Sequence, residues 1–122
     1  MKTTNFIYFV LIIFMLISCS SPLDSIDNSL SIEPSNSKLK IANSSNETIF
    51  LYVVEQEVAA SINWTPHFGD PKVLKNSSTT INYSEIYNGS NEPVNSGDKV
   101  IIYYWDSTNK SDPKIFNKVI EL

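Results

Sequence analysis

The sequence is poor in the side chains from which disulfides and metal sites are built. Its 122 residues include one cysteine, Cys19, and one histidine, His67. A single thiol cannot form a disulfide within the chain. Blue-copper sites need a cysteine and two histidines, and structural zinc sites need several cysteine or histidine ligands. The composition therefore excludes both kinds of metal site, and we expect no cofactor.

Arginine is absent, and lysine is outnumbered by acidic residues. Nine lysines stand against 13 aspartate and glutamate residues, which gives a formal net charge of −4. Arginine is the usual bidentate reader of phosphate and guanine. Because the balance is acidic and no basic run is present, we expect no binding to nucleic acid.

Catalytic patterns are equally scarce. A serine nucleophile would depend on His67 as its base, and no G-x-S-x-G motif is present. Paired carboxylates for glycoside hydrolysis remain an alternative, drawn from Glu55, Glu57, Glu85 or Asp106. Glu55 and Glu57 share a strand face, where charges typically keep a sheet edge soluble. We therefore expect a protein that is not an enzyme.

What the sequence does contain is an apolar run near its start. Residues 6–17 read FIYFVLIIFMLI and follow a short polar start with Lys2. Twelve helical residues span about 18 Å, which is too short for a bilayer core of roughly 30 Å. A charged start, a short apolar run and a small-residue exit are typical of a secretory signal peptide. The sequence predicts such a peptide over residues 1–18.

The exit of this run is Leu16-Ile17-Ser18-Cys19. It resembles the lipobox of bacterial lipoproteins, in which an aliphatic residue, a tolerant position and a small residue precede a cysteine. The resemblance implies cleavage before Cys19, a diacylglycerol on its thiol and an acyl chain on its amino group. Several chains anchor a protein firmly in a membrane. The alternatives are an ordinary secretory cleavage site, which Leu16 at the −3 position disfavours, or an uncleaved anchor.

In lipoproteins of this kind, an aspartate after the cysteine often marks retention in the inner membrane. Ser20 and Ser21 follow Cys19 here. The resemblance therefore implies the bacterial outer membrane, with the domain on either its periplasmic or its surface face.

Residues 19–37 are rich in serine, aspartate, asparagine and proline and show no useful period. We interpret them as the lipidated cysteine followed by a flexible tether. The alternative is that Leu30 and Ile32 add an edge strand to the following domain.

Residues 38–122 alternate short apolar strands with polar turns. The strongest runs are IFLYVV (49–54) and KVIIYYW (99–105). Six or seven short strands, with turn signals every eight to twelve residues, favour an all-β fold: a small immunoglobulin-like β-sandwich. An up-and-down barrel is less favoured, because the strands are few and short. Residues 53–62 have a helical alternative, since residues 55–60 are good helix formers. The predicted core is Ile49, Leu51, Val53, Val100, Ile102, Tyr104, Ile120 and Leu122.

The loop NWTPHFGD is the candidate binding site. Trp64, His67, Phe68 and Asp70 bring aromatic rings, an imidazole and a carboxylate together in seven residues. Loops at the ends of sandwiches often carry recognition. The alternative is that the aromatics cap the core while His67 lies in solvent. The neighbouring run Tyr103-Tyr104-Trp105 has the same two interpretations, a binding face or the core and its margin.

Taken together, the residues predict a small lipoprotein held in the membrane through Cys19. We expect a non-catalytic binding or assembly role in the bacterial envelope, with an envelope protein as partner. The alternative is a surface module that binds glycan or peptide, or that neutralises an enzyme as an immunity protein does.

Overall fold

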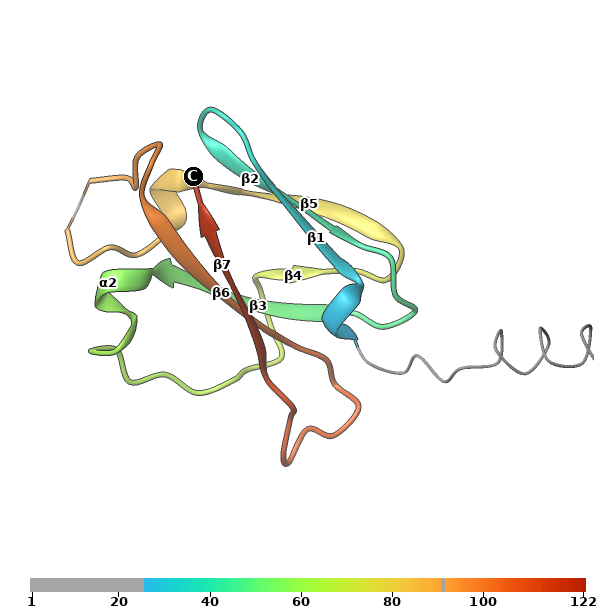
Figure 1. Ribbon diagram of the computed structural model, residues 1–122. Coiled ribbons are helices and arrows are strands. Elements are labelled where there is room, and N and C mark those ends of the chain that lie inside the picture. The colour runs from blue at the N-terminus through green and yellow to red at the C-terminus, as the bar shows by residue number, and fades with distance from the viewer. Residues whose placement is uncertain (1–25, 91) are drawn as a thin grey trace, which may run out of the picture.

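Seven strands form two antiparallel sheets in the computed structural model, which describes residues 26–90 and 92–122 (Figure 1). The three-stranded sheet has the order β1 (Leu30–Pro34), β2 (Lys38–Asn43) and β5 (Ser77–Asn82). The four-stranded sheet has the order β4 (Lys72–Val73), β3 (Ile49–Glu55), β6 (Lys99–Trp105) and β7 (Phe116–Glu121). The helical segments are short: η1 (Ile26–Asn28), α2 (Gln56–Ala59) and η2 (Tyr83–Glu85). The predicted all-β sandwich is confirmed.

Alternation along the strands builds the core between the two sheets. Leu39 and Ile41 of β2 point inward against Leu51 of β3 and Ile102 of β6, and all four are fully buried. Each such side chain contributes about 2 kcal/mol on burial. Five of the eight predicted core residues are buried, namely Ile49, Leu51, Val100, Ile102 and Tyr104. Val53, Ile120 and Leu122 are partly buried and pack against that core.

The segment after β3 divides between the two predicted conformations. β3 continues as a strand to Glu55, where its pairing with β6 ends. α2 then makes a single turn over Gln56–Ala59. The strand prediction is right up to Glu55, and the helical alternative is right only for Gln56–Ala59. The strand and the helix are therefore both present, but each is shorter than the sequence predicts.

The flexible tether predicted over residues 19–37 is wrong for residues 26–37. These residues form η1, β1 and the turn into β2, and Leu30 pairs with Asn43 in the sheet. Ile26 and Leu30 are buried. Cys19, the rest of the tether and the predicted signal peptide lie outside the described residues. The described part of the domain therefore includes residues 26–37, and the edge-strand alternative for Leu30 and Ile32 is confirmed.

Two side chains of the opposite sheet hold this N-terminal segment in place. The Tyr104 hydroxyl donates to Asp27 Oδ1 at 3.0 Å, and Lys118 Nζ donates to the Leu30 carbonyl at 2.9 Å. Burial and the bond to Asp27 raise the pKa of Tyr104, so its phenol stays protonated. These bonds connect β6 and β7 to the segment around η1 and the first residue of β1. They depend on tertiary contacts that the local sequence does not reveal.

A buried asparagine joins the two sheets at one corner. Asn43 is 2% exposed, and its Nδ2 donates to the carbonyls of Glu47, Val73 and Leu74 at 2.7, 3.1 and 3.2 Å. Its Oδ1 accepts from the backbone N–H and the hydroxyl of Ser45 at 2.9 and 2.7 Å. The chain crosses between the sheets twice here, after β2 and after β4. Asn43 therefore fixes both crossings through one side chain.

Replacement of this side chain is expected to be costly. Asn43→Ala removes the donor of one buried and two part-buried hydrogen bonds to carbonyls, so we expect a loss of about 2–3 kcal/mol in the free energy of unfolding. Urea denaturation followed by circular dichroism measures it. The matched control is Asn46→Ala in the same turn, where the exposed Oδ1 accepts only from Asn76 Nδ2. The control should change stability by less than about 0.5 kcal/mol. Equal effects of the two variants would contradict the role of Asn43.

Candidate functional site

The edge of β3 is only partly covered by β4. β4 pairs with Ile49 and Phe50 alone, and the Leu51 N–H donates to the Pro71 carbonyl at 3.0 Å. Pro71 has no N–H with which to return that bond, so the ladder ends there. Further along, the Glu55 N–H donates to the Tyr87 carbonyl at 2.9 Å. One stretch of β3 between these two contacts is left without a neighbouring strand.

Val53 lies in the middle of that gap. Every second residue of an antiparallel strand directs its N–H and C=O to the same side. Leu51 and Glu55 direct their N–H groups away from β6, so Val53 directs its backbone groups the same way. The isolated parallel bridge between Val54 and Tyr87 occupies the Val53 carbonyl, and within the described residues no strand pairs with the Val53 N–H. One backbone donor of β3, the Val53 N–H, is therefore open to a ligand.

A cavity of about 480 Å³ lies at this open edge. That volume falls in the usual range for small-ligand sites. β3 provides one wall, and β5 with η2 from the other sheet provides the opposite one. The lining residues are Tyr52, Val53, His67, Asp70, Pro71, Ile81, Glu85 and Tyr87.

The cavity combines aromatic rings with carboxylates. Tyr52 and Tyr87 supply the rings, and Asp70 and Glu85 supply the charges. Burial raises the pKa of the Tyr52 phenol, and the neighbouring phenols of Tyr103 and Tyr87 raise it further. The Tyr52 hydroxyl therefore stays protonated and can donate a hydrogen bond. Glu85 Oε1 accepts from Asn82 Nδ2 at 3.3 Å, which leaves its other oxygen for a ligand.

The four predicted binding residues divide into two pairs. His67 and Asp70 line the cavity, whereas Trp64 and Phe68 do not. His67 is exposed, and its Nδ1 accepts from the Gly69 N–H at 3.3 Å. The structure thus brings together one imidazole and one carboxylate of the loop, and adds residues from three other segments.

Trp64 and Phe68 belong instead to an outer aromatic cluster on the face of the four-stranded sheet that points away from the core. Trp64 stacks on Tyr52 with ring centroids 4.8 Å apart and planes 9° apart. It also contacts Tyr103 at 4.8 Å and Trp105 at 5.6 Å. Phe68 meets the edge of Phe50 at 5.3 Å. The members of the outer aromatic cluster are Phe50, Tyr52, Trp64, Phe68, Tyr103 and Trp105.

One hydrogen bond fixes the loop over this cluster. Trp105 Nε1 donates to the His67 carbonyl at 2.9 Å, and Trp105 is fully buried. The aromatic side chains of the loop thus cover the outside of the sheet rather than the core between the sheets. His67 is exposed, as the alternative interpretation of this loop expected.

Loss of the Trp64 ring is expected to destabilise the domain. Trp64→Ala removes three ring contacts, and we expect a decrease of about 2 kcal/mol in the free energy of unfolding. Urea denaturation followed by circular dichroism is the measurement. Tyr87→Ala is the comparison, because its side chain is 56% exposed and should change stability by less than about 0.5 kcal/mol. Unchanged stability of Trp64→Ala would show that this ring is free for binding.

Sequence reasoning did not find Tyr52 and Tyr87, and it considered Glu85 only for hydrolysis. Tyr52 lies in an apolar run whose pattern predicts a buried strand. Tyr87 is a single aromatic residue before a polar loop, and this was the one local signal for it. These residues meet only because the pairing of β3 is interrupted, which is a tertiary feature.

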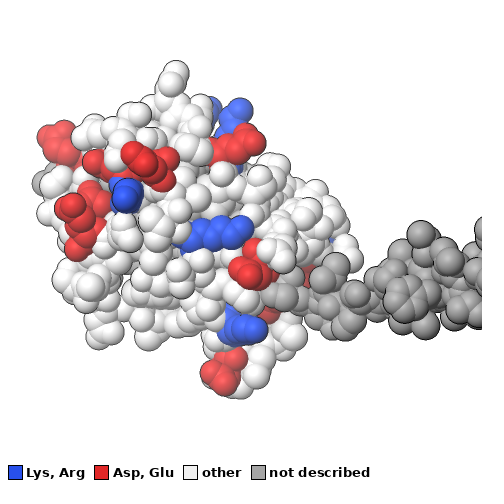
Figure 2. Space-filling view, viewed as in Figure 1, with Lys and Arg blue, Asp and Glu red and all other residues white. Residues whose placement is uncertain are grey.

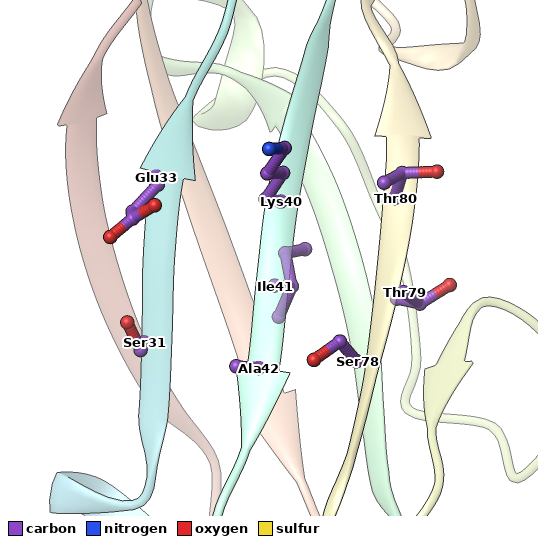
Figure 3. Close-up of a pocket in the computed structure, with 8 residues that line it drawn as sticks. All are labelled: Ser31, Glu33, Lys40, Ile41, Ala42, Ser78, Thr79 and Thr80. Atoms are coloured by element: carbon purple, nitrogen blue, oxygen red, sulfur yellow. The ribbon is translucent and has the colours of Figure 1, made fainter.

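The outer face of the three-stranded sheet carries a second hollow, of about 500 Å³ (Figure 3). It arises because Ser31, Ala42 and Ser78 form a row of small side chains across the three strands. In the next row Glu33 lies opposite Lys40, so the charges are balanced. This shallow face has no feature that selects a ligand.

Acidic side chains gather over the end of the domain that carries α2 (Figure 2). Glu55, Glu57 and Asp98 line a shallow hollow there, together with Lys99. Partial burial raises the pKa of Glu55, and the charges of Asp98 and Glu57 raise it further. Across residues 26–90 and 92–122, no three side chains are placed to hold a metal ion.

Comparison with known proteins gives no relative from which a function can be transferred. No family model, curated protein or solved structure matches the chain significantly. In the part of the chain that the structure describes, no helix is long and apolar enough to cross a membrane. What the protein does therefore has to be inferred from its own residues.

Proposed function

We propose that this chain is a lipid-anchored, non-catalytic binding protein of the bacterial outer membrane. In this proposal Cys19 carries the lipid, and the cavity at the open edge of β3 receives the partner. The observation that carries it is the backbone gap at Val53, which opens into a cavity with both aromatic and acidic walls. The lipobox at residues 16–19 supports the anchor.

The chemistry of the cavity favours binding over catalysis. Asp70 and Glu85 both line it, which is the arrangement that a glycosidase would use. A catalytic carboxylic acid has to be shielded from water to keep its proton near neutral pH. Both side chains are exposed, so they suit electrostatic recognition better than proton transfer.

The folded domain lies close to its proposed anchor. Only six residues separate Cys19 from Ile26, the first residue of η1. Fully extended, this segment reaches about 25 Å. η1 packs near the start of β3, whereas α2 follows the end of β3 at the opposite side of the domain (Figure 1). Tyr87 bridges Val54, so this wall of the cavity lies near the α2 end of β3.

The anchor is tested by removing the thiol. Cys19→Ala cannot be alkylated, so we expect the protein to appear in the soluble fraction or to remain unprocessed. Membrane fractionation and mass spectrometry of the purified N-terminus distinguish these results from the parent chain. If Cys19→Ala still fractionated with the outer membrane in processed form, the lipid anchor would be ruled out.

The cavity is tested by photo-cross-linking in intact cells. Tyr87 and Leu74 are both 56% exposed, but only Tyr87 lines the cavity. We expect p-benzoylphenylalanine at position 87 to capture one envelope partner, and the same residue at position 74 to capture none. Equal products at both positions would indicate random contacts and would contradict a binding role for the cavity.

A further inference from the structure

We propose that the cavity binds an extended peptide and that the peptide inserts a lysine side chain between the tyrosines and the carboxylates. This inference rests on the proposed function, since it names the ligand of the same site. Three observations support it: the charge of the lining, the aromatic rings, and the unpaired backbone N–H of Val53.

The lining is acidic and contains no lysine. Asp70 and Glu85 contribute the two formal negative charges, and the chain as a whole has a net charge of −4. The one imidazole in the lining, His67, accepts a hydrogen bond from the Gly69 N–H at its Nδ1. An ammonium group therefore enters a site that attracts it, whereas an anion would be repelled.

The aromatic rings suit the same charge. A lysine ammonium is attracted to an aromatic face when it lies within about 6 Å of the ring centroid. The domain makes such contacts itself: Lys110, Lys114 and Lys118 lie 5.5, 5.1 and 5.8 Å from the rings of Phe68, Phe116 and Tyr104.

In the cavity, Trp64 covers one face of the Tyr52 ring, while Tyr87 is 56% exposed. Tyr87 is therefore the ring with most surface left for a ligand cation. The methylene groups of a lysine can pack along Ile81 and Pro71, which also line the cavity.

The backbone of Val53 favours a peptide over a free amine. Its N–H faces the cavity between two positions where β3 is already paired, through Leu51 and Glu55, while its C=O is occupied by the bridge to Tyr87. A carbonyl of an extended peptide can accept from this N–H, as the carbonyls of neighbouring strands do. A simple amine has no carbonyl to accept from the Val53 N–H.

Three matched probes separate these contributions in a two-dimensional NMR titration of the full isotope-labelled protein, purified from membranes in detergent. N-acetyl-lysine N-methylamide offers both the backbone and the charge. N-acetyl-norleucine N-methylamide keeps the backbone and removes the charge, and pentylammonium keeps the charge and removes the backbone. The amide signals of Val53 and Tyr87 report on the cavity.

We expect the lysine derivative to shift both signals and to bind at least about tenfold more tightly than the norleucine derivative. Added salt should weaken its binding, because the carboxylates are exposed and screened. Asp70→Asn and Glu85→Gln should each weaken binding severalfold. Glu121→Gln, an exposed acid on β7 outside the cavity, is the control and should have no effect.

The remaining outcomes overturn different parts of the proposal. Equal affinity for the norleucine derivative would refute the preference for charge while leaving the cavity as a binding site. Equal affinity for pentylammonium would refute the backbone hydrogen bond from the Val53 N–H to a peptide. If no probe shifts Val53 or Tyr87 while cross-linking at position 87 succeeds, the partner binds there by other chemistry and the lysine proposal fails alone.

Discussion

The amide of Asn43 is the interaction on which the rest of this domain depends. It is the one non-aromatic polar side chain that is buried among the described residues, and its five hydrogen bonds hold both crossings between the sheets. One of these crossings fixes the end of β4 that pairs with Ile49, and so holds β4 against β3. The gap at Val53 lies beyond the other end of β4, where Pro71 interrupts the ladder. A domain of this size gains specificity in this way, because apolar packing alone does not fix where a strand stops.

The sheets were predictable where the alternation was strong. The run at residues 99–105 coincides with β6, and the predicted core residues of β3 and β6 other than Val53 are buried because both strands lie in the middle of a sheet. β1 was not the preferred prediction. Leu30 and Ile32 stand alone in a serine-rich segment, and the local pattern gives no period on which to base a strand. Their ordering comes from pairing with β2 and from bonds to Tyr104 and Lys118, which are 70 or more positions away.

Two of the four predicted binding residues, His67 and Asp70, line the cavity. His67 and Asp70 were found because an imidazole and a carboxylate in a proline-rich loop are unusual. Trp64 and Phe68 were grouped with them by proximity in sequence, yet the loop turns its aromatic rings to the sheet and its polar groups to the cavity. Tyr52 and Tyr87 lie 35 positions apart and meet only across an interrupted strand edge. No local pattern encodes such an interruption, because it depends on where a different strand ends.

The inward lysine of β7 has a consequence for how copies of this domain can meet. The proposed lipid anchor would confine them to a plane, where edge-to-edge contact between sandwiches becomes frequent. Lys118 lies on an edge strand, points toward the core and is held by the Leu30 carbonyl, so a second β7 that displaced it would leave a charge without its partner. At the other sheet, β1 ends in Pro34, which has no N–H to give to a neighbour. The gap on β3 leaves one backbone N–H free rather than the edge of a whole strand. The edges at β7 and β1 thus carry features that oppose strand pairing between copies of this domain.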